Sequence, residues 1–295
     1  MPIASGPWRF QNVVQTIDYN IPSNAPVPYG VGATVGAFNC GTLNTMGAVA
    51  TLIAGAQLSF VGQRVQISLN IASVGGANTQ AIAEVLTAPA GTTTYTTFIP
   101  NILCGQGVAA GGQNGFNALH TFDVEVPSGV DMLIRAQCAD TTVRAGRANL
   151  IVYGNPSRPD AIDPGVGIES LGADRANTNG TEVLCASLTT TFNQPFVTLG
   201  ILTERARGVQ LSPSSQSTAV VVGNVGVFWQ LGVDQNRLTG VPTISRNCNI
   251  SEGGAIYFQA GEIPVDIPAG AALTVRGWCS VATATTFPVV AHAVY

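Results

Sequence analysis

The sequence contains no lysine, and all 12 of its basic residues are arginine. Charged residues make up only 9% of the chain, against about 25% in an ordinary soluble domain. The net charge of -4 and the lack of any basic run argue against a protein that binds nucleic acid through its phosphates. A chain so poor in charge suits a protein that hides much of its surface in an assembly. The arginine bias has two interpretations: a GC-rich genome, or the planar interface contacts that arginine makes and lysine does not.

Long hydrophobic runs are also missing. No stretch approaches the roughly 18 consecutive apolar residues that suggest a membrane span, so we expect no membrane association. The first residues, from Met1 to Arg9, lack the basic and apolar regions of a signal peptide. We therefore expect synthesis in a cytoplasm, with the six cysteines in the thiol form.

Most motifs of catalysis and metal binding are absent. There are only two histidines, His120 and His292, and no Cys-x-x-Cys pair, so we expect no zinc site and no other cofactor. A Gly-x-Ser-x-Gly elbow and a phosphate-binding loop are missing too. The 16 acidic residues leave a glycosidase open, because that chemistry needs two carboxylates. Asp123, Glu125 and Asp266, however, alternate with apolar residues and predict a wetted strand face, and we expect no enzymatic activity.

What the sequence does contain is an internal repeat. Residues 122–129 (FDVEVPSG) match residues 263–270 (IPVDIPAG), and Val65-Gln66-Ile67-Ser68 matches Val209-Gln210-Leu211-Ser212. His120 and His292 fall at roughly corresponding places, for which we expect structural roles. The cysteines, expected to be small buried hydrophobes, form three pairs separated by 145, 144 and 141 residues: Cys40 with Cys185, Cys104 with Cys248, and Cys138 with Cys279.

Each repeat predicts several short strands. Residues 64–71 alternate strictly between apolar and polar side chains, and so do residues 225–233, where Trp229 lies in phase with valines and should belong to the core. No segment has an apolar stripe of helical period. The Pro-x-Gly sequences at 127–129 and 268–270 are typical of tight turns. The predicted fold is all-β, with two tandem jelly-roll or β-sandwich domains related by internal duplication.

Four segments follow from this pattern. Residues 1–25 form an N-terminal arm, residues 26–154 the first jelly-roll domain, residues 155–172 a proline-rich linker, and residues 173–295 the second jelly-roll domain. Trp8 and Phe10 lie in the arm. They either hold the arm on its own domain or anchor it in a neighbouring subunit, as aromatic interface residues do.

Two matched arginines are the most notable charges. Arg135 and Arg276 occupy the same place in the two repeats. Each is either a solvated outward residue or an interface contact that holds a carboxylate of a neighbour with both nitrogens. Trp278 is out of phase with Cys279, so it is the tryptophan that we expect to be exposed. The candidate interface residues are therefore Trp8, Phe10, Arg135, Arg276 and Trp278.

The turn segments resemble a known family. The units FDVEVPSGVDMLIRAQC and IPVDIPAGAALTVRGWC are similar to a segment of jelly-roll virion proteins from tailed bacteriophages, in which a strand, an Ile-Pro-Ala-Gly turn and an arginine-bearing strand precede a closing Val-x-Val-Tyr strand. The resemblance covers about a quarter of the chain. It implies a head decoration, head fibre, spike or tail-associated protein located in the virion, and it identifies no ligand-binding residue.

The leading hypothesis is a phage virion structural protein that assembles through apolar burial and β-edge contacts. Its expected partners are other virion proteins and further copies of itself, in a trimer or pentamer. One alternative is a major capsid protein with two jelly rolls per subunit, which a short, rigid junction would favour. Another is a carbohydrate-binding appendage that recognises a host surface glycan, with Trp278 as the stacking ring. An enzyme that cleaves capsule or cell-wall polymers is the fourth.

Overall fold

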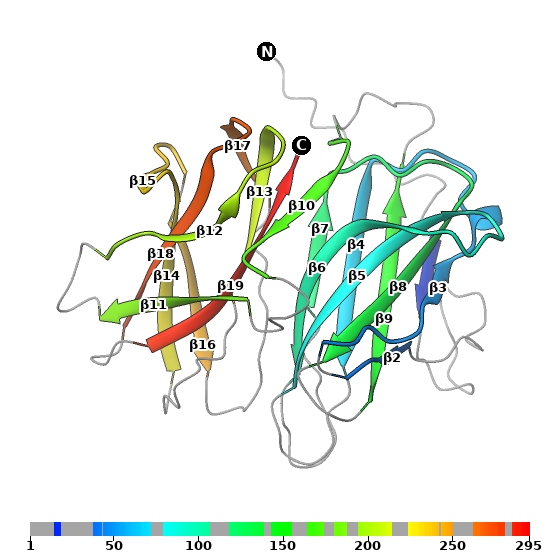
Figure 1. Cartoon of the computed structure of the whole chain (residues 1–295), viewed down its shortest axis with the longest axis horizontal. Coiled ribbons are helices and arrows are strands. Elements are labelled where there is room, and N and C mark those ends of the chain that lie inside the picture. Colours follow the sequence, from blue (N-terminus) through cyan, green and yellow to red (C-terminus); the bar gives the residue numbers. More distant parts are fainter. Residues whose placement is uncertain are drawn as a thin grey trace.

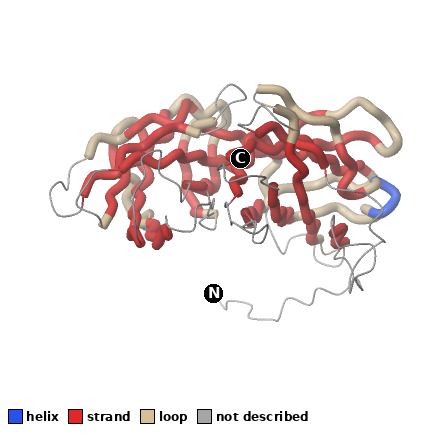
Figure 2. The backbone as a smooth tube through the Cα atoms, turned by 90° about the horizontal axis from the view of Figure 1, so that it is seen from below, coloured by secondary structure: helices blue, strands red, loops and turns tan. Residues whose placement is uncertain are grey.

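The computed structural model in Figure 1 is built almost entirely of strands. The structure describes residues 15–18, 38–42, 44–71, 79–106, 118–138, 143–154, 164–173, 180–187, 194–213, 224–241, 243–249, 262–280 and 285–295. Within these residues the only helical segment is one 3-10 turn, η1 (Gly55–Gln57), visible at one end of Figure 2. The predicted all-β fold is therefore confirmed.

The first half is a sandwich of two sheets. The five-stranded sheet contains β1 (Gln15–Asp18), β2 (Phe38–Cys40), β4 (Arg64–Ile71), β7 (Ala118–Phe122) and β9 (Arg144–Tyr153). The four-stranded sheet contains β3 (Ala50–Ile53), β5 (Thr79–Pro89), β6 (Thr96–Gln106) and β8 (Val130–Cys138).

The second half forms one curled sheet of ten strands. These are β10 (Ile168–Leu171), β11 (Thr181–Ser187), β12 (Val197–Ile201), β13 (Ala206–Pro213), β14 (Asn224–Val233), β15 (Asn236–Arg237), β16 (Ile244–Asn249), β17 (Ile263–Ile267), β18 (Ala272–Cys279) and β19 (Thr285–Val294). The sheet is continuous because β11 pairs with both β18 and β19.

The two halves share one pattern of strand pairing. In the first half the orders are β1-β9-β4-β7 and β3-β8-β5-β6, and in the second they are β10-β19-β13-β17 and β12-β18-β14-β16. In each half the first and last strands are neighbours, β1 with β9 and β10 with β19, as in a jelly roll, where the chain wraps around itself. Even the parallel bridge between Gly41 and Gln137 has its counterpart between Ala186 and Trp278.

The pairing also tests the cysteine alignment. Cys40 and Cys185 occupy equivalent positions on β2 and β11, opposite Arg144 and Thr285. Cys138 and Cys279 are likewise equivalent on β8 and β18. All four are buried thiols with no exposed surface, as predicted.

The third cysteine pair is not equivalent. Cys104 lies opposite Ala81, whose counterpart is Val227, and the residue opposite Val227 is Arg246. Cys248 is therefore shifted by two residues along its strand. The match at this pair was wrong because a shift of two preserves the strand face and leaves the alternating pattern intact.

The alternating patterns do form the cores. Val65, Ile67 and Leu69 on β4 are fully buried, and Trp229 on β14 is 1% exposed, so it belongs to the core as predicted. The predicted turns hold Gly129 and Gly270 at φ of 75° and 84°, a left-handed conformation that favours glycine.

The two halves lie side by side and are packed together (Figures 1 and 2). On β19, Phe287, Val289, Ala291 and Ala293 face the core of the second half. The intervening Val290 and Val294, together with Ile168 of β10, belong to the core of the first half. One strand thus supplies apolar side chains to both cores.

The connection between the halves is partly structured. Residues 155–163 of the predicted linker lie outside the described residues. Gly165 accepts from the amide of Glu125 and donates to the carbonyl of Asp123, both at 2.9 Å. Ile168–Leu171 then pairs with β19 as β10. The described part of the connection is therefore hydrogen-bonded to both halves.

Candidate functional site

The predicted interface residues fall into two groups. Trp8 and Phe10 lie outside the described residues. Arg135, Arg276 and Trp278 lie on β8 and β18, the equivalent strands of the two halves. Their use as intermolecular contacts stays a prediction, while their partners within the chain are defined.

Arg135 forms a partly buried ion pair with the first half's own Glu84. Its Nη2 lies 2.7 Å and its Nε 2.9 Å from Glu84 Oε2 on the neighbouring strand β5. The guanidinium also lies over the ring of Tyr95, 5.5 Å from its centre. The carboxylate expected from a neighbour is therefore supplied by the same chain. Arg135 is not a freely solvated residue.

Arg276 has the equivalent position but a neutral partner. Its Nε and Nη2 donate to Gln230 Oε1 at 3.1 and 3.0 Å, and Gln230 stands where the first half has Glu84. The guanidinium lies 4.5 Å from the ring centre of Phe196 and 5.1 Å from that of Trp278. Burial, followed by the charge of Arg237, lowers the pKa of Arg276 from its ordinary value.

The expectation of an exposed Trp278 is wrong. The residue is only 6% exposed, and the guanidinium of Arg276 lies over its ring. A sugar cannot stack on a ring that an arginine already covers, so the glycan-binding alternative loses its candidate residue. Alternation failed here because Trp278 has a neighbouring strand on each side, with Phe228 of β14 and Ala186 of β11 as its partners, and its counterpart Gln137 in the first half is buried in the same way.

A polar site that the sequence did not predict lies where the two halves meet, and we call it the junction. We use this name for the contacts of β6 and β7 in the first half with β10, β13 and β19 in the second. One part of the junction is a β-bulge in β6. Ala83 pairs with Ile102 and Val85 with Ile99, which leaves Pro100 and Asn101 outside the regular ladder.

The bulge turns two polar groups toward the second half. His292 Nε2 lies 3.0 Å from the carbonyl of Pro100, and because a carbonyl only accepts, the ring carries its proton on Nε2. Asn101, at φ 47°, donates through Nδ2 to the carbonyl of Ala173 at 3.1 Å. Bulges commonly re-aim side chains in this way, and asparagine tolerates a positive φ better than most residues.

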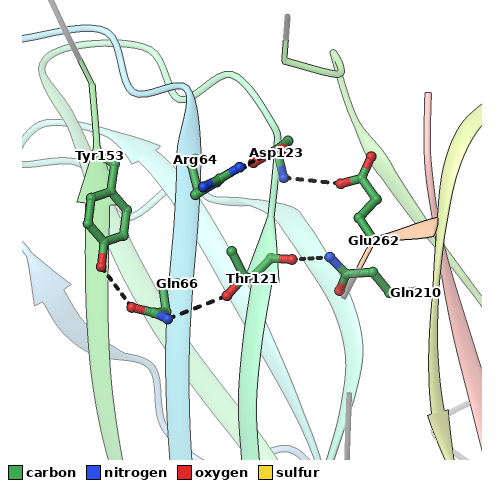
Figure 3. A network of polar contacts seen from close by, with 7 residues as sticks. All are labelled: Arg64, Gln66, Thr121, Asp123, Tyr153, Gln210 and Glu262. Atoms are coloured by element: carbon green, nitrogen blue, oxygen red, sulfur yellow. Dashed lines mark hydrogen bonds and ion pairs between the residues drawn. The ribbon is translucent and has the colours of Figure 1, made fainter. Parts of the chain in front are cut away.

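A chain of polar contacts continues across the junction (Figure 3). Tyr153 donates to Gln66 Oε1 at 2.7 Å, and Gln66 Nε2 lies 3.5 Å from the hydroxyl of Thr121. The carbonyl of Thr121 accepts from Gln210 Nε2 of the second half. Gln66 and Gln210 are themselves equivalent residues of β4 and β13.

Charged groups lie beside this chain. Arg64 holds Asp123 through Nε and, at 2.9 Å, through Nη2, and the amide of Asp123 lies 3.4 Å from Glu262 Oε2. Burial, followed by the charge of Asp123, raises the pKa of Glu262. Glu125 and Asp266 are exposed, as predicted, but Asp123 is half-buried because it faces the second half.

Two buried histidines complete the junction. His120 on β7 and His292 on β19 have no exposed surface, and their ring centres are 6.1 Å apart. Phe122 lies 5.3 Å from His292, edge to face. Burial lowers the pKa of His120 to about 3, with a smaller contribution from His292, and burial lowers the pKa of His292 to about 4. Both rings are therefore neutral at neutral pH.

The expected correspondence of the histidines is wrong, because β7 is the counterpart of β17, and β19 is the counterpart of β9. The two rings lie close together because the halves pack against each other, and they do not occupy equivalent positions of the repeat. One sequence signal pointed to the junction: the last strand reads Pro-Val-Val-Ala-His-Ala-Val without alternation, which is typical of a strand buried on both faces.

Among the described residues, no group of three or more His, Cys, Asp or Glu could hold a metal ion. In the same part of the chain, no helix has the length and hydropathy needed to cross a membrane.

Comparison with known proteins adds little. No protein-family model matches the chain, and no curated protein matches it. The PBSX exported protein XepA is 11% identical, with 94% of this chain and 100% of that chain covered, at a TM-score of 0.19. The vicilin from Solanum melongena is also 11% identical, with 83% and 73% covered, at the same TM-score. At such scores neither similarity carries an argument about fold or function.

Proposed function

We propose that the protein is a structural subunit of a bacteriophage particle, a capsid decoration, head fibre or spike subunit that acts through protein contacts and without catalysis. The observation that carries this proposal is the pair of equivalent jelly rolls joined by buried side chains of β19. Such a unit is a two-lobed block with few charges, suited to burial among other subunits.

Two further features support the proposal. The strand–turn–strand units around residues 122–138 and 263–279 resemble those of phage jelly-roll proteins. The matched arginines of these units are also held by side chains of their own half, which fixes the outer sheet faces that carry them. Preorganised surfaces of this kind lose little conformational entropy on association.

Particle fractions provide the test. Particles released by the host that carries the gene are separated on a density gradient and probed with an antibody raised against this protein. We expect the protein to band with the particles, and immunogold labelling to place it on the head or an appendage. Its presence only in the particle-free lysate would contradict the proposal.

A second candidate is a major capsid protein with two jelly rolls per subunit. The connection between the halves favours it, because Gly165 is hydrogen-bonded to the first half and β10 pairs within the second, so the two lobes are held side by side. Copy number distinguishes the candidates. A capsid protein is the most abundant band of the purified particle and forms its shell, whereas a decoration or spike subunit can be stripped from an intact shell.

A further inference from the structure

The duplicated fold offers an internal template for an interface. In the second half, the outward side of β13 and β19 is covered by the first half. Its side chains are Gln210, Val290, His292 and Val294. Gln210 meets β7 and His292 meets β6, and the two valines belong to the core of the first half. In the first half, the equivalent outward side belongs to β4 and β9.

The strand pairing identifies the equivalent residues. Gln66 lies opposite Ile151 as Gln210 lies opposite His292, and Arg64 lies opposite Tyr153 as Gly208 lies opposite Val294. We call Arg64, Gln66, Ile151 and Tyr153 the first-half face. All four side chains are half-exposed, whereas His292 and Val294 have no exposed surface.

The second half also carries a counterpart of the surface that covers its own face. The bulged segment Ile99-Pro100-Asn101-Ile102 is matched in sequence by Val241-Pro242-Thr243-Ile244. β17 ends the order of its sheet as β7 ends its own. Thr243, Pro264 and Asp266 are exposed there. We call these three residues the second-half edge.

We propose that copies of this chain associate head to tail by repeating the internal junction, with the second-half edge of one copy docking on the first-half face of the next. The partner is therefore a second copy of this chain, and the inference rests on the proposed function. In the repeated junction, Gln66 takes the place of Gln210 and donates to the carbonyl of Glu262 of the neighbouring chain, which is equivalent to Thr121.

The composition of the first-half face fits a surface that is covered only after folding. Tyrosine and arginine are enriched among the residues that dominate binding energy, and polar groups keep the surface compatible with water before assembly. The equivalent face of the second half, which is covered within the same chain from the start, has Gly208 and Val294 in place of Arg64 and Tyr153. A head-to-tail contact uses two different surfaces, so repetition gives a closed ring or an open filament.

The test uses two variants of the full chain. Ile151→Arg places a charge on the first-half face, and Thr243→Arg places one on the second-half edge. Thr51→Arg, on an exposed position of β3 in the other sheet, is the matched control. Sedimentation velocity over a range of concentrations measures association, and thermal unfolding verifies that each variant is folded.

We expect the wild type and Thr51→Arg to self-associate, and each of the other two variants to be monomeric alone. A mixture of Ile151→Arg and Thr243→Arg should then form a one-to-one complex, because the first retains an intact edge and the second an intact face. Variants on a self-complementary, two-fold interface would not restore one another in this way.

Three results would overturn the inference. The wild type could be monomeric at every concentration, the two variants could associate as well as the wild type, or their mixture could contain only monomers. Particle labelling separates this failure from failure of the proposed function: a protein that bands with particles but shows one of these results keeps its function and loses this interface.

Discussion

The outward sides of two equivalent strands, β9 and β19, differ although their inward sides agree. β9 pairs with β4 in the same register as β19 pairs with the equivalent strand β13, and both bury alternate residues in their own sandwich. The other side of β9 carries Ile151 and Tyr153, which are half-exposed, whereas β19 carries His292 and Val294, which are sealed against the first half. The two strands therefore agree on the side that faces their own core and differ on the side that does not.

The comparison extends to the backbone. β6 has a bulge at Pro100 and Asn101, opposite Glu84, whereas β16 begins at Ile244 and its pairing with β14 stops before the matching position. The bulge contacts the second half through the carbonyl of Pro100 and the side-chain amide of Asn101. The strand that meets the second half is thus longer than its counterpart and bulged at the contact.

We expect acid to cause the largest loss of stability, because it protonates the two histidines that are buried only where the halves meet. The unfolded chain binds protons on His120 and His292 below a pH of about 6.5, but the folded chain does so only below about 3 and 4. Folding is therefore fully favoured above pH 6.5 and is destabilised as the pH falls toward 4. We expect a loss of roughly 3 kcal/mol for each histidine.

Urea unfolding at several pH values measures this loss. The double variant with His120→Leu and His292→Leu should show a shallower dependence over the same range. Glu262 acts in the opposite direction, because its raised pKa makes the folded state bind protons more readily as the pH falls. An unchanged pH dependence in the double variant would show that the histidines are not its source.

Substitutions at Val294 and at Tyr153, its equivalent in the first half, should have the next largest effect on the free energy of unfolding. Val294→Arg buries an unpaired charge in the junction and should reduce the free energy of unfolding by about 3 to 5 kcal/mol. Tyr153→Arg, at the equivalent position, loses one hydrogen bond and should cost about 1 kcal/mol. Equal losses in urea unfolding would contradict the difference between the two faces.

Asn101 tests the bulge. Asn101→Ala removes the hydrogen bond to Ala173 and places alanine at a positive φ, for a combined cost of about 2 kcal/mol. Asn101→Gly keeps the backbone conformation accessible and should cost about 1 kcal/mol. Thr243→Ala, at the matching position of the second half, is the control and should change the midpoint of thermal unfolding very little.

The smallest effect is expected from exchanging the partners of the matched arginines. Glu84→Gln gives the first half the pair found in the second, and we expect a loss of about 1 kcal/mol because a charge-assisted hydrogen bond becomes a neutral one. Gln230→Glu makes the reverse change and should be neutral or slightly stabilising. A double variant more stable than the wild type by several kcal/mol would show that the two sites are not equivalent.

Much of the fold was predictable. The alternation in residues 64–71, the turns at 127–129 and 268–270 and the repeated cysteines predicted two sandwiches of the same kind, and the structure has that pattern. Trp229 and the buried cysteines followed from strand phase alone. The phase of Trp278 misled because its surroundings depend on β11, a strand distant in sequence, and the register of Cys248 misled because shifts of two are silent in an alternating pattern.

The candidate site was less predictable. Arg135 and Arg276 were found from the repeat, but their partners Glu84 and Gln230 lie on another strand and depend on register. The use of Trp8, Phe10, Arg135, Arg276 and Trp278 between molecules, and the domain boundaries, remain predictions.

By itself the sequence determined which side of an alternating strand such as β4 or β14 faces its own core, because the two-residue period of a strand ties hydrophobicity directly to burial. Only the tertiary structure decided which of two equivalent outer faces is covered, since His120 and His292 lie far apart in sequence and meet through the packing of whole sheets. Alternation records that a face is apolar, but the identity of the surface against it is fixed by contacts that no local pattern contains.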